Sequence, residues 1–157
     1  MSAYSLLRII HSYWRWAVFV LAVMVLIRSL IGIVAHRGWS RDDDLTMRRF
    51  FNALDLQVFL GLVLYFFFSP FWSATYQTFG ETMRSPVARF FGVEHETAML
   101  LAVLAAHVGW HRAKLAATDT AKHRTVAVAM AIFFALLLWA IPWPWREVGR
   151  PLFRITP

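Results

Sequence analysis

The chain has no cysteine, and only 16% of its 157 residues are charged. The absence of cysteine excludes disulfide frameworks, thiolate zinc sites, iron–sulfur clusters and cysteine nucleophiles. Soluble domains contain about 45–50% apolar residues and about a quarter charged residues, whereas 59% of this chain is hydrophobic. A single short chain cannot bury that excess in a core of its own. We therefore expect the chain to be embedded in a lipid bilayer.

Motifs for hydrolytic or nucleotide chemistry are also missing, because the sequence has no glycine-rich phosphate loop and no nucleophile–base pair. We therefore assign no catalytic residue. A net charge of +7 raises the question of nucleic acid, but 14 of the 16 basic residues are arginines scattered between apolar runs. That distribution is typical of membrane flanks in contact with anionic lipid. We expect the bilayer, and no nucleic acid, as a partner.

Four apolar runs are each long enough to cross a hydrocarbon core, which takes about 20 helical residues. They cover about residues 13–35, 50–68, 90–110 and 125–141. Helix is the expected structure, because an open strand would leave its backbone groups unpaired in lipid. The sequence shows no internal repeat and no second domain. We predict an all-α integral membrane protein with one transmembrane domain, residues 1–157, folded as an antiparallel four-helix bundle.

The positive charge is distributed unevenly among the connectors. Nine of the 16 basic residues, including both lysines, lie in the hairpins after the first and third runs. The positive-inside rule places these hairpins in the cytoplasm and both termini on the outer side. Asp44 is the expected N-cap of the second helix, and the aromatic segment 71–79 is expected along the membrane interface.

Polar residues within a membrane span are costly, so each is a candidate functional residue. The first and third spans run in the same direction, which places His11 and His95 at nearly the same outer depth. Arg15 lies on the same helical face as His11, one turn deeper. Glu94 and Glu96 flank His95, where either could accept the second N–H of its imidazole. The outer third therefore gathers two imidazoles, a guanidinium and two carboxylates.

Two histidines on separate facing helices are the donor set of a b-type haem. On this reading His11 and His95 are the axial ligands of one haem, and Arg15 lies beside a propionate. The alternative is that both histidines are hydrogen-bonded structural residues. His107 follows His95 by about 18 Å along the same helix, so the two cannot ligate one haem. We do not expect a second haem at His107.

The inner third contains two further opposite charges. Arg28 and Asp55 agree in depth to within one helical turn, so we predict a structural ion pair between them. His36 and His123 fall in charged connectors, and we expect both to face solvent or lipid headgroups.

Five segments of the chain form a recognisable series, namely HSYWRW at 11–16, LQVFLGLVLY at 56–65, RFFGVEH at 89–95, KHR at 122–124 and IPWPW at 141–145. In these segments, and in their order along nearly the whole chain, the sequence resembles a group of small bacterial four-helix membrane proteins loosely labelled "cytochrome b". The resemblance implies a bacterial inner-membrane location and a haem b, and it favours His11 and His95 as its ligands.

Two functions fit these features. The first is a membrane-bound haem-b electron-transfer protein that exchanges electrons with quinol or a partner redox subunit at the outer face. The second is a haem-free accessory subunit of a larger respiratory or photosynthetic membrane complex, which suits a small chain with 14 Phe and eight Trp residues. A transporter fits less well, because the sequence shows no inverted repeat and no broken helix.

Overall fold

The computed structural model describes residues 2–153, except for the side chains of residues 74–76. This described part is 82% helical and contains no strand, as the all-α prediction requires. The elements are α1 (Ala3–Val34), α2 (Arg41–Val63), the π-helical η1 (Leu64–Phe68), α3 (Pro70–Gln77), α4 (Phe79–Arg84), α5 (Pro86–Arg89), the π-helical η2 (Phe90–Glu94), α6 (His95–Lys114) and α7 (Asp119–Ala140).

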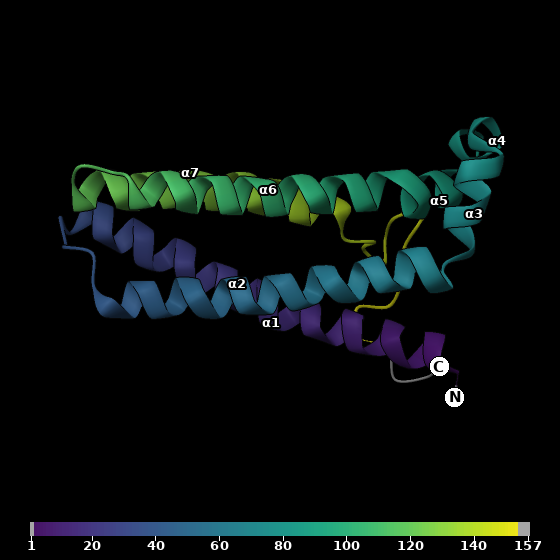
Figure 1. Ribbon diagram of the computed structural model, residues 1–157, viewed down its shortest axis with the longest axis horizontal. Helices are drawn as coiled ribbons and strands as arrows, with labels where there is room; N and C mark the ends of the chain where they lie inside the picture. The colour runs from purple at the N-terminus through teal and green to yellow at the C-terminus, as the bar shows by residue number, and fades with distance from the viewer. Residues whose placement is uncertain (1, 154–157) are drawn as a thin grey trace.

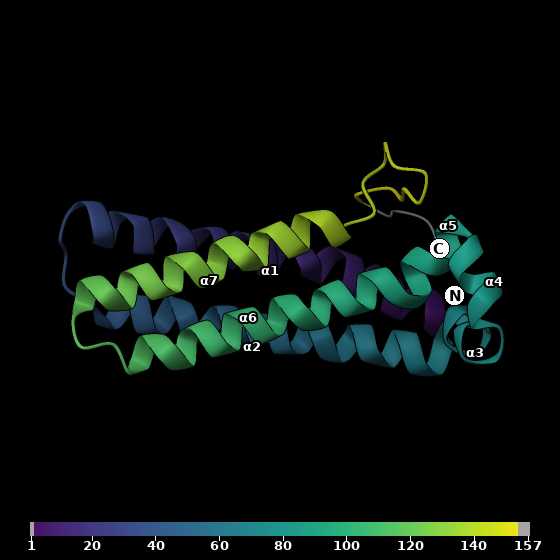
Figure 2. The ribbon, with the colours of Figure 1, turned by 90° about the horizontal axis from the view of Figure 1, so that it is seen from above.

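The four long helices α1, α2, α6 and α7 lie side by side (Figures 1 and 2). Helix α1 packs on α2 and α7, and α6 packs on α7. The short helices α3, α4 and α5 gather at the end of the molecule where α1 begins (Figure 1). The tight α1–α2 and α6–α7 connections lie at the opposite end, so each connection joins neighbouring helices that run in opposite directions.

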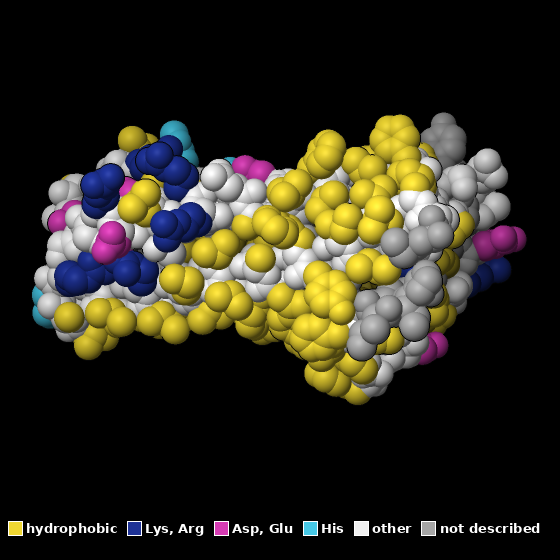
Figure 3. All heavy atoms as spheres, turned by 90° about the horizontal axis from the view of Figure 1, so that it is seen from below, with side chains coloured by type: hydrophobic (Ala, Val, Ile, Leu, Met, Phe, Trp, Pro, Cys, Tyr) yellow, Lys and Arg dark blue, Asp and Glu magenta, His cyan; other side chains and the backbone are white. Residues whose placement is uncertain are grey.

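Three of the helices are long and apolar enough to cross a membrane, namely those at Ala3–Val34, Arg41–Phe68 and Asp119–Ala140. They overlap three of the four predicted spans. Helix α6 is not among the three, because it carries the polar residues Glu96, His107 and His111 and is less apolar. Lysine and arginine gather most densely at the end with the two tight connections, and hydrophobic side chains dominate the rest of the face in Figure 3.

The α1–α2 connection is fixed by a capping box at the start of α2. Ser40 is the N-cap, because its hydroxyl accepts a hydrogen bond from the backbone N–H of Asp43. In return, the side-chain carboxylate of Asp43 accepts a hydrogen bond from the backbone N–H of Ser40. Such reciprocal bonds satisfy two donors at a helix start. The predicted N-cap at Asp44 is therefore wrong by four residues, and Asp44 instead accepts a hydrogen bond from the indole of Trp39 at 2.8 Å.

Asp43 is also the partner of two arginines. Its carboxylate, 2% exposed, lies 2.8 Å from Arg28 Nε and 2.7 Å from Arg37 Nη1. The hydrogen bond to Asp43 raises the pKa of Arg37 above its usual value. The predicted Arg28–Asp55 pair is not formed, because Arg28 reaches back to the connection and Asp55 lies on the outer surface of α2. The depth match itself was wrong, because Gln57 and Ala53 of α2 contact His11 and Trp14 of α1, so Asp55 lies several helical turns away from Arg28.

His123 was expected to face solvent or headgroups, but it is completely buried in α7. Its ring lies against the indole of Trp39, with 4.8 Å between ring centroids. Gly32 of α1 supplies the space, because a Cβ atom there would overlap the imidazole. The charged neighbours Lys122 and Arg124 suggested a solvated loop, whereas the helix already begins at Asp119 and turns His123 inward.

A candidate cofactor-binding cavity

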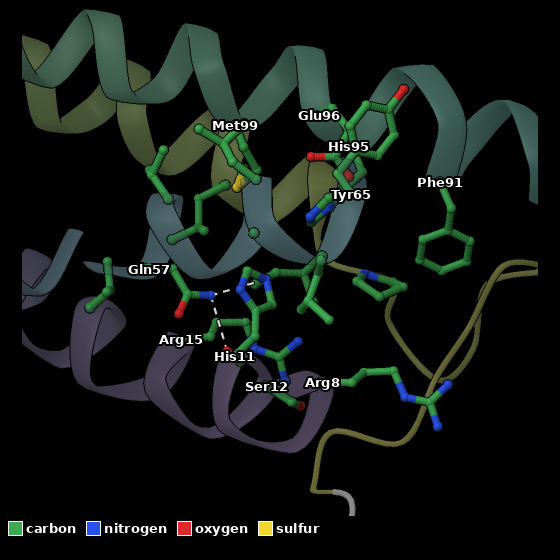
Figure 4. Close-up of a pocket in the computed structure, with 18 of the residues that line it drawn as sticks. Arg8, His11, Ser12, Arg15, Gln57, Tyr65, Phe91, His95, Glu96 and Met99 are labelled. Carbon is green, nitrogen blue, oxygen red and sulfur yellow. Dashed lines mark hydrogen bonds between the residues drawn. The ribbon is translucent and has the colours of Figure 1, made fainter. Parts of the chain in front are cut away.

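A cavity of about 180 Å³ lies between α1, α2 and α6 and is bordered by the segment that follows α7. A single bound water needs only about 10–15 Å³, so this cavity has room for an organic group. Its polar lining comes from several elements (Figure 4) and consists of Tyr4, Arg8, His11, Ser12, Arg15, Gln57, Tyr65, Ser69, His95, Glu96 and Arg150. The structure thus brings together His11, Arg15, His95 and Glu96, four of the residues that the sequence singles out.

His11 enters the cavity from α1, in which it lies well inside the helix. The Gln57 amide, from α2, donates to Nε2 of His11 at 3.2 Å and to the backbone carbonyl of His11 at 3.0 Å. Nδ1 of the same imidazole is buried and has no hydrogen-bond partner. Gly61, one turn after Gln57, lets the ring approach α2, since a Cβ there would lie 3.1 Å from His11 Cε1.

His95 enters the same cavity from the first residue of α6 (Figure 4). Its Nδ1 lies 2.8 Å from the carbonyl oxygen of Ala140 at the end of α7. A carbonyl only accepts, so Nδ1 carries the proton and the lone pair of a neutral ring is on Nε2. A backbone carbonyl that fixes one ring nitrogen while leaving the other to ligate is a common arrangement around protein-bound metals.

The two glutamates beside His95 do not take the predicted role. Glu94 pairs with Arg89, whose Nε lies 2.7 Å from its carboxylate. Glu96 lines the cavity, but the Nδ1 proton of His95 goes to Ala140. Neither glutamate therefore orients the imidazole as predicted, because Glu94 pairs with Arg89 and the Nδ1 proton of His95 goes to Ala140 and not to Glu96. The reason is that Ala140, the last residue of α7, places a helix-end carbonyl within hydrogen-bond distance of the ring.

Arginine side chains give the cavity a cationic side. Arg15 Nη2 donates to the backbone carbonyl of Leu152 at 3.0 Å, while its Nε is buried and has no partner. Arg8 Nε is likewise buried without a partner. Arg8, Arg15 and His11 project from one side of α1 toward the cavity (Figure 4). Guanidinium groups in such a setting favour an acidic group.

The unsatisfied polar atoms concentrate at this cavity. Among the described residues, the buried side-chain nitrogen and oxygen atoms without a partner belong to Arg8, His11, Arg15, Gln57 and His123. All of these except His123 border the cavity. Buried polar groups are nearly always hydrogen-bonded in native proteins. Their concentration around one space makes this cavity the candidate binding site among the described residues.

Two π-helical segments, η1 and η2, lie beside the cavity. Tyr65 in η1 donates from its hydroxyl to the carbonyl oxygen of Gly92 in η2, at 2.6 Å. This buried bond ties α2 to the segment that leads directly into His95. Single π-helical turns inside α-helices occur frequently at functional sites. Here η1 contains Tyr65 and η2 ends directly before His95, and both residues border the cavity.

Several lining residues were missed from the sequence or given another role. Gln57, Tyr65, Arg8 and Arg150 were not assigned to the site. Gln57 carried a usable signal, because it is a polar residue within an apolar run and shares a helical face with Gly61. Arg150 reaches the cavity only because the chain folds back after α7, which no local pattern indicates.

Comparison with known proteins identifies no relative of this chain. The chain matches no protein-family model, no curated protein and no solved structure. What this cavity can bind is therefore inferred from its two imidazoles, its arginine side chains and its apolar lining residues.

Proposed function

We propose that this protein is a membrane-bound haem-b electron-transfer protein, with His11 and His95 as the axial ligands of one haem and Arg15 beside a propionate. The observation that carries the proposal is the convergence of two imidazoles from different helices on one cavity whose polar atoms lack partners. Two imidazoles from facing helices could hold a b haem through its iron. A haem bound there would supply one-electron chemistry at its iron.

The residues fit that group by charge and by hydrogen bonding. His95 is oriented by Ala140 and presents the lone pair of Nε2. His11 is held against α2 by Gln57, so ligation through Nε2 would replace one hydrogen bond with a metal bond. Arg8 and Arg15 each have a buried Nε without a partner, which suits the acidic edge of a porphyrin.

The proposal includes a transmembrane arrangement. Helix α6 is taken as the fourth span, since it lies alongside α7 over its length and connects to it by a short turn (Figure 2). Nine of the 16 basic residues lie in the two tight connections and the adjoining parts of the helices, which favours a cytoplasmic location for this end. Both termini and the cavity would then lie toward the outer side of a bacterial inner membrane, where quinol or a partner redox subunit exchanges electrons with the haem.

A haem-free accessory subunit of a larger membrane complex is the second candidate. The observation that favours it is the bidentate role of Gln57, which already satisfies one nitrogen and the backbone carbonyl of His11 without a metal. In that case the histidines and arginines of the cavity would serve to hold α1, α2 and α6 together.

Absorption spectra of single variants distinguish the two candidates. We expect His11→Ala and His95→Ala each to abolish the reduced α band of the purified protein, because each would remove an axial ligand. His107→Ala is the matched control, since His107 lies on α6 but outside the cavity. Loss of the α band in the control variant would contradict the proposed ligand pair.

A further inference from the structure

The outward surfaces of the long helices differ in polarity. Every exposed side chain of α1 between Tyr13 and Val34 is apolar, and so is every exposed side chain of α7 between Val126 and Ala140. Apolar surfaces of this kind suit contact with lipid tails. Helices α2 and α6, which lie in front in Figure 1, present a different surface.

Polar side chains occupy the exposed surface of α2 and α6 at depths where lipid would otherwise surround them. On α2 they are Asn52 and Asp55, which share an exposed stripe with Phe59. On α6, His107 shares an exposed stripe with Leu104 at a spacing of three residues. Ionisable residues inside a membrane almost always face a protein neighbour or water and not lipid. The α2/α6 face is therefore unsuited to lipid over this part of its length.

The carboxylate and the imidazole on this face lie close to each other. Asp55 Oδ1 is 3.5 Å from His107 Nε2, and their side chains are 60% and 46% exposed. Nδ1 of His107 lies 3.0 Å from the carbonyl oxygen of Val103 in the preceding turn. The carboxylate has further acceptor capacity that this one long contact does not fill. A neighbour on this face would therefore be stabilised by a hydrogen-bond donor at the depth of Asp55.

A second copy of the chain meets this requirement. We propose that the α2/α6 face is a self-association surface on which two copies pair about a two-fold axis along the membrane normal. Asp55 and His107 share one depth, and such an axis preserves depth. The acid of one copy can therefore meet the imidazole of the other, and the reverse contact forms by symmetry. With His107 protonated on both ring nitrogens the face is self-complementary in charge, because Nδ1–H is directed to Val103 and Nε2–H is left for a carboxylate. The apolar outer faces of α1 and α7 offer no such pairing.

Disulfide trapping tests the surface directly, because the chain has no native cysteine. Phe59→Cys and Leu104→Cys place a thiol on the proposed surface, at positions 62% and 57% exposed. Ile27→Cys and Val128→Cys, 50% and 62% exposed on α1 and α7, are matched controls. After oxidation of the full-length protein in lipid vesicles, we expect at least tenfold more covalent dimer for a thiol on the α2/α6 face than for either control. Equal yields at all four positions would overturn the proposal.

Two further measurements keep the test decisive if neither thiol lies near the axis. Counting of labelled subunits by photobleaching, at low protein-to-lipid ratio, should give two copies per particle for the unmodified sequence. The double variant Asp55→Asn/His107→Gln should shift this distribution at least threefold toward single copies, with no loss of folded protein. Single copies for the unmodified sequence, or a cross-link only to a different protein, would contradict the proposal.

Discussion

Nδ1 of His95 lies 2.8 Å from the carbonyl oxygen of Ala140, the last residue of α7. The bond uses one of the carbonyls that a helix end leaves without an intrahelical partner. It ties the first residue of α6 to the end of α7 and turns the other ring nitrogen toward the cavity. His95 therefore has a structural role and a candidate ligand role, which involve different atoms.

Replacement of His95 by asparagine should separate these two roles. The asparagine amide can donate to Ala140 as Nδ1 does but cannot ligate iron in place of Nε2. We expect His95→Ala to lower the free energy of unfolding by about 1–3 kcal/mol, because the Ala140 carbonyl loses its partner, and His95→Asn to lower it less. Both variants should lose the haem spectrum. Unfolding in detergent and absorption spectra measure the two effects, and an unchanged spectrum in His95→Asn would exclude His95 as a ligand.

A methyl group at position 61 should disturb His11. The added Cβ would lie 3.1 Å from Cε1 of a ring that Gln57 holds in place. We expect Gly61→Ala to be less stable than the unmodified protein by about 1–2 kcal/mol, as for other over-packed sites.

Gly80→Ala is the control for this variant, since nothing lies within 4 Å of its added Cβ. Alanine is the better helix former, so we expect it to leave stability unchanged or raise it by up to about 1 kcal/mol. Equal effects of the two substitutions would show that the position of His11 does not depend on Gly61.

Neutralisation of Asp43 should weaken the α1–α2 connection far more than neutralisation of Asp55. Removing one member of a buried pair costs about 3–5 kcal/mol, but Arg28 and Arg37 are each 32% exposed. We therefore expect a loss of about 1–3 kcal/mol for Asp43→Asn. Asp55→Asn, on the α2 surface, should change the free energy of unfolding of the single copy by less than about 0.5 kcal/mol. The reverse order in unfolding experiments would contradict this assignment of the buried pair.

The buried hydroxyl of Tyr65 offers a test of the link between η1 and η2. Tyr65→Phe removes the donor to Gly92 and leaves a buried carbonyl without a partner. We expect a loss of about 1–3 kcal/mol. Tyr13→Phe is the control, because Tyr13 is 43% exposed and should lose little. A loss in Tyr13→Phe as large as that in Tyr65→Phe would show that the Gly92 bond contributes nothing of its own.

Much of the helical framework could be predicted from the sequence, because long apolar runs and the breakers between them depend on local composition. The shared depth of His11 and His95 also followed, since it needs only the direction and length of two helices. The rotation of a helix about its axis was not predictable in the same way. His123 illustrates this point, because it faces inward against the expectation. The Arg28–Asp55 prediction failed on depth as well, because α2 meets α1 at Trp14 and His11 near Asp55, whereas Arg28 reaches Asp43.

Contacts made by the end of α7 and by the chain that follows it could not be predicted either. Ala140 and Leu152 receive hydrogen bonds from His95 and Arg15 through backbone carbonyls, and a carbonyl has no signature in the amino-acid sequence. The predicted partners, Glu94 and Glu96, were the nearest acceptors along the chain. The fold instead supplied acceptors that are distant in sequence.

The central claim is that the cavity holds one haem b, and a reduced-minus-oxidised absorption spectrum of the purified protein tests it most directly. The protein should be isolated from membranes of cells able to make haem, and its haem-to-protein ratio measured on the same sample. We expect a Soret band, a sharp α band after reduction with dithionite, and one haem per chain. If a sample that retains its native membrane partners shows no Soret band, the result would contradict the claim and favour the haem-free subunit.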